Sequence, residues 1–254
     1  SEITSEKVVD MYQAVGKELI GRIAVKVHSG EKGNQNYLRP EFLNKMVEHV
    51  SGTVVECNTA YEGSRDTTEK HLQLINEHGW SEYFDVDIMD GVGPDLVLEI
   101  PEGKVIKKNY VGKNIENYDS MLVISHFKGH PMGGYGGALK QLSIGVASGK
   151  GKRYIHCIGK EDGSYEDMFK VEQDKFLESM ADASKSVVDY FNGNIVYINI
   201  MCNMSVDCDC CAVAKEPCMR DIGILSSLDP VALDQACVDL VYNSKDEGKN
   251  HLIE

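Results

Sequence analysis

Residues 121–125 read Met-Leu-Val-Ile-Ser, a short apolar run that is typical of a buried strand. Runs of the same kind lie before and after it, at 23–27, 54–57 and 195–201. Amphipathic stretches separate them, and one begins at Arg39-Pro40-Glu41, where proline suits a first helical turn. This alternation predicts an α/β fold, with a mixed, largely parallel sheet, helices on both faces and Rossmann-like layers.

Weaker signals extend the same alternation along the chain. Further short strands are expected at 83–88, 96–100, 105–110 and 222–225, the middle two as a hairpin. Asp66 is expected to cap a helix, with Glu69 completing a capping box, and Asp229 to cap another over about 230–242. A long helix is expected over about 165–191. We expect one α/β domain over 1–254, and a division into lobes of about 1–115 and 116–254 stays open.

Charge and hydropathy exclude several classes of protein. The chain has 254 residues, with 26 Lys+Arg against 40 Asp+Glu and a formal net charge of −14. A nucleic-acid binder needs a basic face, so this balance argues against nucleic acid and against anionic lipid surfaces. No apolar run approaches the roughly 20 residues needed to cross a bilayer, and no signal peptide is visible. We expect a cytoplasmic protein without nucleic-acid or membrane partners.

A glycine-rich loop framed by basic side chains follows the run at 121–125. It contains, in order, His126, Lys128, His130, Gly133, Gly134, Gly136, Gly137, Lys140 and His156. Glycines let a backbone approach a ligand closely, so the four glycines and Lys128 are candidate cofactor-binding residues. A phosphate-cradling loop is one alternative, although the G-x-x-x-x-G-K-[ST] order is absent. Neutral imidazoles bind zinc, nickel, copper or iron, and a lysine can anchor a carbonyl-bearing cofactor.

Five of the eight cysteines crowd one segment, at Cys202, Cys208, Cys210, Cys211 and Cys218. In a strand, Cys208 and Cys210 would share one face and Cys211 would point away. Flanking carboxylates at Asp207 and Asp209 are expected to raise a thiol pKa, which favours metal binding over nucleophilic catalysis. Three alternatives stay open: a copper(I) site with neighbouring methionines, a vicinal disulfide, and simple burial.

The loops that follow successive strands are expected to converge. Ligands of open α/β sheets bind at the carboxyl ends of the strands, and the unusual residues of this chain fall there. The segment Tyr61-Glu62-Gly63-Ser64-Arg65 precedes a predicted helix, where an anionic ligand would be favoured. The sequence therefore predicts one site built from imidazoles, an amine and a thiol pair.

The chain resembles the uncharacterised iron-sulfur center protein family, also known as domain of unknown function 362. The resemblance rests on motifs spread over nearly the whole chain, namely 26–31, 58–65, 125–130, 133–140, 207–210, 221–226 and 229–236. Many relatives carry a ferredoxin-like insertion after the segment that ends near His156, whereas here a short polar linker follows. The resemblance also implies that both ends are trimmed relative to the family.

A second resemblance is to the core of nickel-pincer lactate racemases. His130, Lys140 and His156 follow one another at intervals of 10 and 16 residues, across a Gly-Gly-x-x-Lys stretch. This resemblance implies that Lys140 anchors a nicotinate-derived cofactor, His156 ligates the metal and His130 acts as acid or base. Arg65 lies where those enzymes have a Gly-Thr-His-Arg run, and Ser64 replaces the histidine.

Together these observations predict a metal-dependent enzyme that acts on a small molecule at the strand ends. The candidate metal ligands are His126, His156, Cys208 and Cys210, for a transition metal such as iron, nickel or zinc. The candidate catalytic residues are Lys140, His130 and Arg65. The alternative is an iron-sulfur or soft-metal carrier, or electron-transfer protein, without catalysis. Either function is compatible with a homo-oligomer or a redox partner.

Overall fold

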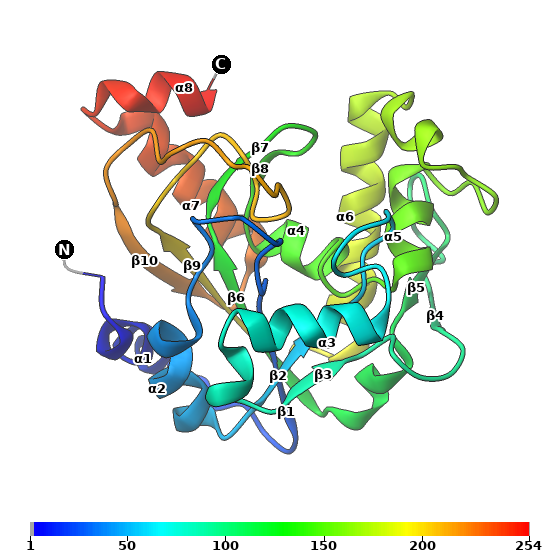
Figure 1. Cartoon of the computed structure of the whole chain (residues 1–254), viewed down its shortest axis with the longest axis horizontal. Coiled ribbons are helices and arrows are strands. Elements are labelled where there is room, and N and C mark those ends of the chain that lie inside the picture. Colours follow the sequence, from blue (N-terminus) through cyan, green and yellow to red (C-terminus); the bar gives the residue numbers. More distant parts are fainter. Residues whose placement is uncertain (1–2, 254) are drawn as a thin grey trace.

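The protein is built around a six-stranded sheet with helices on both faces (Figure 1). The computed structural model describes residues 3–253. The strands are β1 (Ile23–Lys26), β2 (Thr53–Glu56), β3 (Val86–Ile88), β6 (Ser120–His126), β9 (Ile195–Met201) and β10 (Gly223–Ser227). Their order is β10-β9-β6-β1-β2-β3, and only β9 and β10 pair antiparallel. The predicted α/β class with a mixed, largely parallel sheet is therefore confirmed.

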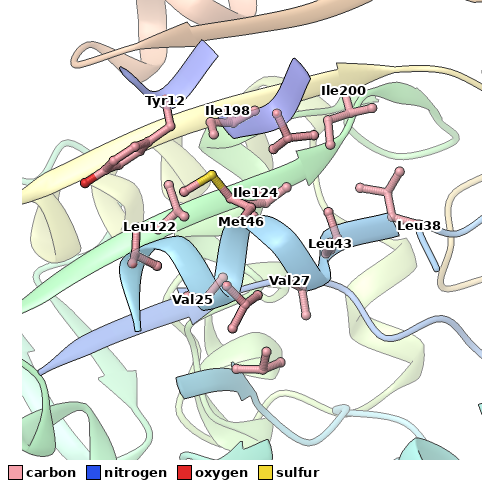
Figure 2. Close-up of a cluster of buried hydrophobic side chains, with 14 of the residues drawn as sticks. Tyr12, Val25, Val27, Leu38, Leu43, Met46, Leu122, Ile124, Ile198 and Ile200 are labelled. Atoms are coloured by element: carbon pink, nitrogen blue, oxygen red, sulfur yellow. The ribbon is translucent and has the colours of Figure 1, made fainter. Parts of the chain in front are cut away.

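One face of the sheet packs against the helices nearest the N-terminus. These are α1 (Ser5–Val15), α2 (Pro40–Val50) and α3 (Thr68–Glu77). Figure 2 shows Tyr12 of α1 and Met46 of α2 lying over Val25, Leu122 and Ile198 of the sheet. The residues next to these in each strand point to the opposite face of the sheet, because side chains alternate between the two faces along a strand.

The opposite face packs against the later helices. They are α4 (Ala138–Ser143), α6 (Gln173–Tyr190) and α7 (Pro230–Asn243). Leu142 of α4 and Leu233 of α7 join Ala24, Met121 and Val123 in a second buried cluster. Helix α5 (Gly149–His156) packs against α6 and against the strand formed by Lys108–Val111. Two apolar layers therefore hold the sheet, and the strand ends are left to form the site.

Two hairpins lie outside the main sheet. The expected hairpin is present as β4 (Leu96–Glu99) and β5 (Lys108–Val111), which pair antiparallel. A second hairpin, which the sequence did not predict, joins β7 (Lys128–His130) to β8 (Gly134–Gly136). The remaining short elements are η1 (Trp80–Glu82), η2 (Lys113–Asn117), η3 (Glu166–Phe169), η4 (Glu247–Lys249) and α8 (Asn250–Ile253).

Several predicted boundaries differ from the structure. Thr67 caps α3 in place of Asp66, because the Thr67 side chain accepts the Lys70 N–H while the Asp66 carboxylate pairs with the Lys70 ammonium. The helix predicted over 165–191 is divided into η3 and α6. The strand predicted over 83–88 is reduced to β3, because the preceding 3₁₀ turn takes the Phe84 N–H onto the Trp80 carbonyl. The Asp229 cap is confirmed, since it accepts two N–H groups of α7.

The parallel strands bring their following loops to one edge of the sheet. β1, β2 and β6 run in the same direction, and β9 is parallel to β6. The segment after β9 lies beside the β7–β8 hairpin (Figure 1), where the Gly129 N–H donates to the Ser205 carbonyl at 2.8 Å, an ordinary backbone hydrogen bond. Within residues 3–253, each helix is too short or too polar to span a bilayer.

Candidate functional site

The cysteine segment forms a turn and not the strand that its C-x-C pattern suggested. The Cys211 N–H donates to the Cys208 carbonyl at 2.9 Å, which curls residues 208–211 back on themselves. The Asn34 side chain donates to the carbonyls of Cys208 and Cys211, at 3.3 and 2.9 Å. The Glu31 N–H donates to the Asp209 carbonyl at 2.9 Å. The loop after β1 therefore holds the turn in place.

This turn brings two sulfurs next to a histidine of the β7–β8 hairpin. The ligand atoms of His130, Cys208 and Cys210 all lie within 4.8 Å of one another. His130 Nδ1 accepts the N–H groups of Gly133 and Met132 at 2.9 and 3.2 Å, so Nε2 is the nitrogen left to face the thiols. A single metal ion could be bound by one nitrogen and two sulfurs with this spacing.

The Cys208 thiol lies in surroundings that favour its thiolate. A hydrogen bond from Cys210 lowers the pKa of Cys208, and although burial opposes this, Lys140 and His130 lower it further. The Lys140 Nζ donates to the Cys208 Sγ at 3.3 Å. The Cys210 thiol keeps the shared proton, and its pKa is raised. Thiolate is the form that binds metals, so Cys208 and Cys210 together need to release only one proton when they bind an ion.

The pKa of Cys208 is lowered and not raised as expected, and both neighbouring carboxylates are engaged elsewhere. Asp209 Oδ1 lies 2.9 Å from His126 Nδ1, and Asp209 Oδ2 accepts from Lys128 Nζ at 2.7 Å. Asp207 accepts the Lys215 N–H at 2.9 Å. Each negative charge is therefore balanced or hydrogen-bonded. Asp207 still opposes the lowering of the Cys211 pKa, and Asp209 adds to the raised pKa of Cys202.

His126 lies behind the thiol turn, not among the donor atoms. Its Nδ1 faces Asp209, and its Nε2 lies 2.6 Å from the Cys202 carbonyl oxygen. Both nitrogens therefore face oxygen acceptors, and neither lone pair is available to a metal ion in this arrangement. Lys128 shares the same carboxylate and donates to the His126 carbonyl at 2.8 Å. These two side chains position Asp209, the residue between the two cysteines.

His156 and Arg65 lie on the wall of a cavity beside the thiols. His156 Nδ1 lies 2.7 Å from the Lys152 carbonyl oxygen, its ring stacks on Phe176, and burial lowers its pKa to about 4. Arg65 donates twice to Glu31 Oε2, both at 3.1 Å, and once to the Tyr61 hydroxyl at 3.2 Å. Neither side chain belongs to the donor trio of His130, Cys208 and Cys210.

The four glycines shape the hairpin and the start of α4. Gly134 has φ +73 at the hairpin turn, where most side chains would be strained. A Cβ on Gly137 would lie 2.4 Å from Asp234 Oδ1, which caps the Ala138 and Leu139 N–H groups. A Cβ on Gly136 would lie 3.5 Å from the Lys128 side chain. Gly133 and Gly134 line a separate apolar cavity with Phe127. The glycines thus place His130 and Lys140.

The cavity beside the thiols has a volume of about 90 Å³. Its lining includes Lys26, His28, Glu56 and Arg65, which belong to β1, β2 and the loops that follow them, and His130, Lys140, Lys152, His156 and Cys210, which come from elements later in the chain than β6. Such a cavity is larger than a single-water site and smaller than the roughly 300–1,000 Å³ of most cofactor pockets. The site therefore combines a possible set of metal donors with room for a small ligand.

Residues 23–239 match the family described as "Domain of unknown function (DUF362)". The chain belongs to this family. No curated protein matches the sequence.

Two solved structures are similar to this DUF362 protein. One is the lactate racemase apoprotein from Thermoanaerobacterium thermosaccharolyticum, with a TM-score of 0.55 and 14% identity over 97% of this chain and 57% of the racemase chain. The other is a protein from Thermotoga maritima, with a TM-score of 0.47 and 13% identity over 78% and 51% of the two chains. The DUF362 chain therefore spans little more than half the length of either. At this identity, the likeness to the racemase shows a shared α/β fold alone.

The DUF362 fold also buries a charged pair that sequence reasoning missed. Lys26 Nζ and Glu56 Oε2 lie 2.6 Å apart with side chains 0% and 3% exposed. Glu56 also accepts from the N–H and hydroxyl of Ser29, at 2.7 and 2.9 Å. A signal was present, because each charged residue interrupts an apolar strand, in Ala-Val-Lys-Val and in Val-Val-Glu-Cys. Opposite charges at matching ends of two neighbouring strands indicate a buried ion pair.

Proposed function

We propose that this DUF362 protein binds a transition metal ion through His130, Cys208 and Cys210 and acts as a metal-dependent enzyme on a small molecule in the adjacent cavity. One observation carries the proposal: the three donor atoms lie within 4.8 Å of one another, and two of the donor residues, His130 and Cys210, line that cavity. Structural zinc sites are closed by four protein ligands, whereas catalytic ones have three and keep a position for water or substrate.

The donor chemistry limits which metal fits. Two thiolates and one imidazole suit zinc or iron and also fit nickel, while calcium and magnesium prefer oxygen ligands. A bound ion of this kind would polarise a carbonyl group or lower the pKa of a bound water. Binding through His130 Nε2 places the imidazole proton on Nδ1, so the Gly133 and Met132 N–H groups would lose their acceptor and the hairpin turn would have to adjust.

The surrounding side chains have separate roles in this proposal. Lys140 neutralises the Cys208 thiolate, because burial disfavours its charge but the nearby cysteines outweigh burial and raise its pKa. His156 faces the cavity as a neutral imidazole that can accept or donate a proton, since burial lowers its pKa to about 4. Asp209, fixed by His126 and Lys128, holds the turn that carries both cysteines.

A nicotinate-derived cofactor on Lys140 fits the site poorly. The cavity of about 90 Å³ is well below the roughly 300–1,000 Å³ of pockets that enclose ligands of that size. The Lys140 amine is also paired with a thiolate, and a charged ammonium has no lone pair for attack on a carbonyl carbon. We therefore derive no step through such a cofactor.

Metal analysis of anaerobically purified, reduced protein tests the proposal. We expect about one equivalent of zinc or iron in the wild type and almost none in the Cys208→Ser/Cys210→Ser double variant, since thiolates supply most of the affinity. Cys218→Ser is the matched control, because the Cys218 thiol contacts the Met204 carbonyl outside the donor trio. Equal metal content in all three proteins would rule out this site.

A metal carrier without catalysis is the second candidate function. It is favoured by the partial exposure of Cys210 and Cys211, through which a partner could reach the ion. The buried packing of Met201, Met204 and Met219 among apolar side chains argues against their use as copper ligands. Zinc transfer to a chelator distinguishes the two functions, because a carrier would release its ion within seconds and an enzyme would retain it over a preparation.

A further inference from the structure

Lys152 lines the same cavity and has no role in the proposed metal centre. It lies in α5 with 8% of its surface exposed, and it forms part of the cavity lining. Its Nζ has one hydrogen bond among the described residues, to the Ala147 carbonyl at 2.6 Å. An ammonium group has three N–H donors, so two of them have no protein partner within residues 3–253.

The other buried cations around the cavity each have an anion. Lys26 pairs with Glu56 at 2.6 Å, and Arg65 pairs with Glu31 at 3.1 Å. Lys140 contacts the Cys208 sulfur at 3.3 Å. Among the described residues, no carboxylate oxygen lies within 4.0 Å of Lys152 Nζ. As far as residues 3–253 show, Lys152 is therefore the cation of this cavity whose charge is left without direct compensation.

The acidic groups nearest to Lys152 are occupied or neutral. Asp90 accepts the N–H groups of Asn58 and Gly149, both at 2.9 Å. Burial raises the pKa of the Cys57 thiol, which therefore stays protonated near neutral pH. Burying an ammonium group without a counter-ion costs several kcal/mol in general, and accordingly burial lowers the pKa of Lys152. A negatively charged ligand would supply the missing compensation.

We propose that Lys152 anchors a small oxyanion, a carboxylate or phosphate group, within the cavity that faces His130, Cys208 and Cys210. This inference rests on the proposed function for one point, namely that the end of the ligand opposite the oxyanion contacts the metal ion. The geometry supports this reading, because Lys152 and the donor residues His130 and Cys210 line one small cavity from different elements. The substrate class is then a small anionic molecule.

Anion titration of the metal-free, reduced wild-type protein tests the inference. Inorganic phosphate and acetate are titrated separately by calorimetry, with sodium chloride at matched ionic strength as reference. We expect saturable binding of at least one oxyanion, and the stronger of the two identifies the group that the cavity recognises. Lys152→Met should weaken this binding about tenfold or more, since hydrogen bonds to charged groups contribute roughly 1.5–3 kcal/mol.

Matched variants separate this effect from misfolding and from surface charge. Lys150→Met removes a lysine of the same helix whose side chain is 53% exposed, and its affinity should stay within about twofold of the wild type. Lys152→Gln is a second neutral variant for the case in which Lys152→Met does not fold. Absence of saturable oxyanion binding by the wild type, or equal affinity in the wild type and a folded neutral variant, would overturn the inference.

Zinc binding measured on the same proteins keeps the two proposals distinguishable. Lys152→Met should retain the zinc content of the wild type, because Lys152 is not a member of the donor trio. Lys152-dependent anion binding in a protein that binds no zinc would support the anion site and contradict the metal centre. Zinc binding without oxyanion binding would contradict the anion site alone.

Discussion

The two walls of the cavity differ in how their charges are matched. The wall from β1, β2 and their loops carries Lys26–Glu56 and Arg65–Glu31, each a buried pair closed within the protein. The wall from the β7–β8 hairpin and the thiol turn carries His130, Cys208 and Cys210, whose donor atoms converge without a carboxylate among them. The first wall therefore supports the fold, and the second is the one suited to bind a ligand.

Substitution in the first wall should have the largest effect on stability. Glu56→Gln would leave the Lys26 ammonium buried without its counter-ion, and we expect a loss of about 3–5 kcal/mol in the free energy of unfolding. Urea denaturation measures this loss. Glu77→Gln is the control, since it breaks the exposed Lys32–Glu77 pair and should cost less than about 1 kcal/mol. A similar loss in the free energy of unfolding for both variants would contradict the conclusion that the first wall supports the fold.

Substitutions of two histidines near the thiol turn should differ in their effect on zinc binding. His130→Gln should abolish stoichiometric zinc binding, because it removes one of the three donors. His126→Gln should keep the stoichiometry at saturating zinc but reduce the affinity by about 10–100-fold, as expected for a residue that orients the site through Asp209. It should also cost about 1–3 kcal/mol, because it weakens a buried charged contact. Zinc titration of both variants measures these effects. Loss of stoichiometric zinc binding in His126→Gln, with stoichiometric binding kept in His130→Gln, would contradict the donor set.

The pH dependence of stability tests the first wall in another way. Burial lowers the pKa of His71 to about 3, and its ring lies 3.4 Å from the Ser29 hydroxyl. The unfolded chain takes up this proton near pH 6.5 and the folded chain does not, so stability is lost as the pH falls below 6.5. His71→Gln should reduce the proton uptake on unfolding at pH 5 by about one proton. Denaturation midpoints of the wild type and of His71→Gln between pH 7 and 4 measure this difference. If the midpoints of both proteins depend equally on pH, burial of His71 is not the cause.

The smallest effect on stability is expected at Lys152. Because no carboxylate within residues 3–253 pairs with this amine, Lys152→Met should leave the free energy of unfolding in chloride buffer unchanged or raise it by up to about 1 kcal/mol. Urea denaturation checks this beside Glu56→Gln. A loss as large as that of Glu56→Gln would mean that Lys152 belongs to the charge-matched wall.

The layers of the fold could be predicted from the sequence because the spacing of apolar residues distinguishes buried strands from amphipathic helices. The apolar runs at 121–125 and 195–201 correspond to strands β6 and β9, and Asp229 caps α7 as its position before Pro230 indicates. The β7–β8 hairpin was missed, because glycines at Gly134 and Gly136 are also typical of an irregular loop. Its geometry depends on backbone pairing with β7, which no local pattern reveals.

The site was harder to predict because it depends on contacts between distant segments. Residue types identified Cys208, Cys210 and His130 as metal-binding candidates or potential acids and bases, but could not show which imidazole faces the thiols. His126 has the same side chain as His130 and lies four residues earlier, yet Asp209 and the Cys202 carbonyl occupy both of its nitrogens. The sign of the thiol pKa shift also required the structure, since Asp209 adjoins Cys208 in sequence but directs its charge to Lys128.

X-ray absorption spectroscopy of the zinc-loaded, reduced protein tests the metal centre most directly. The account predicts two sulfur ligands at about 2.3 Å and one imidazole nitrogen at about 2.0–2.1 Å, with a light atom completing the shell. The sulfur signal should vanish in the Cys208→Ser/Cys210→Ser variant. A first shell of oxygen and nitrogen alone in the wild type, or a shell of four sulfurs, would contradict it.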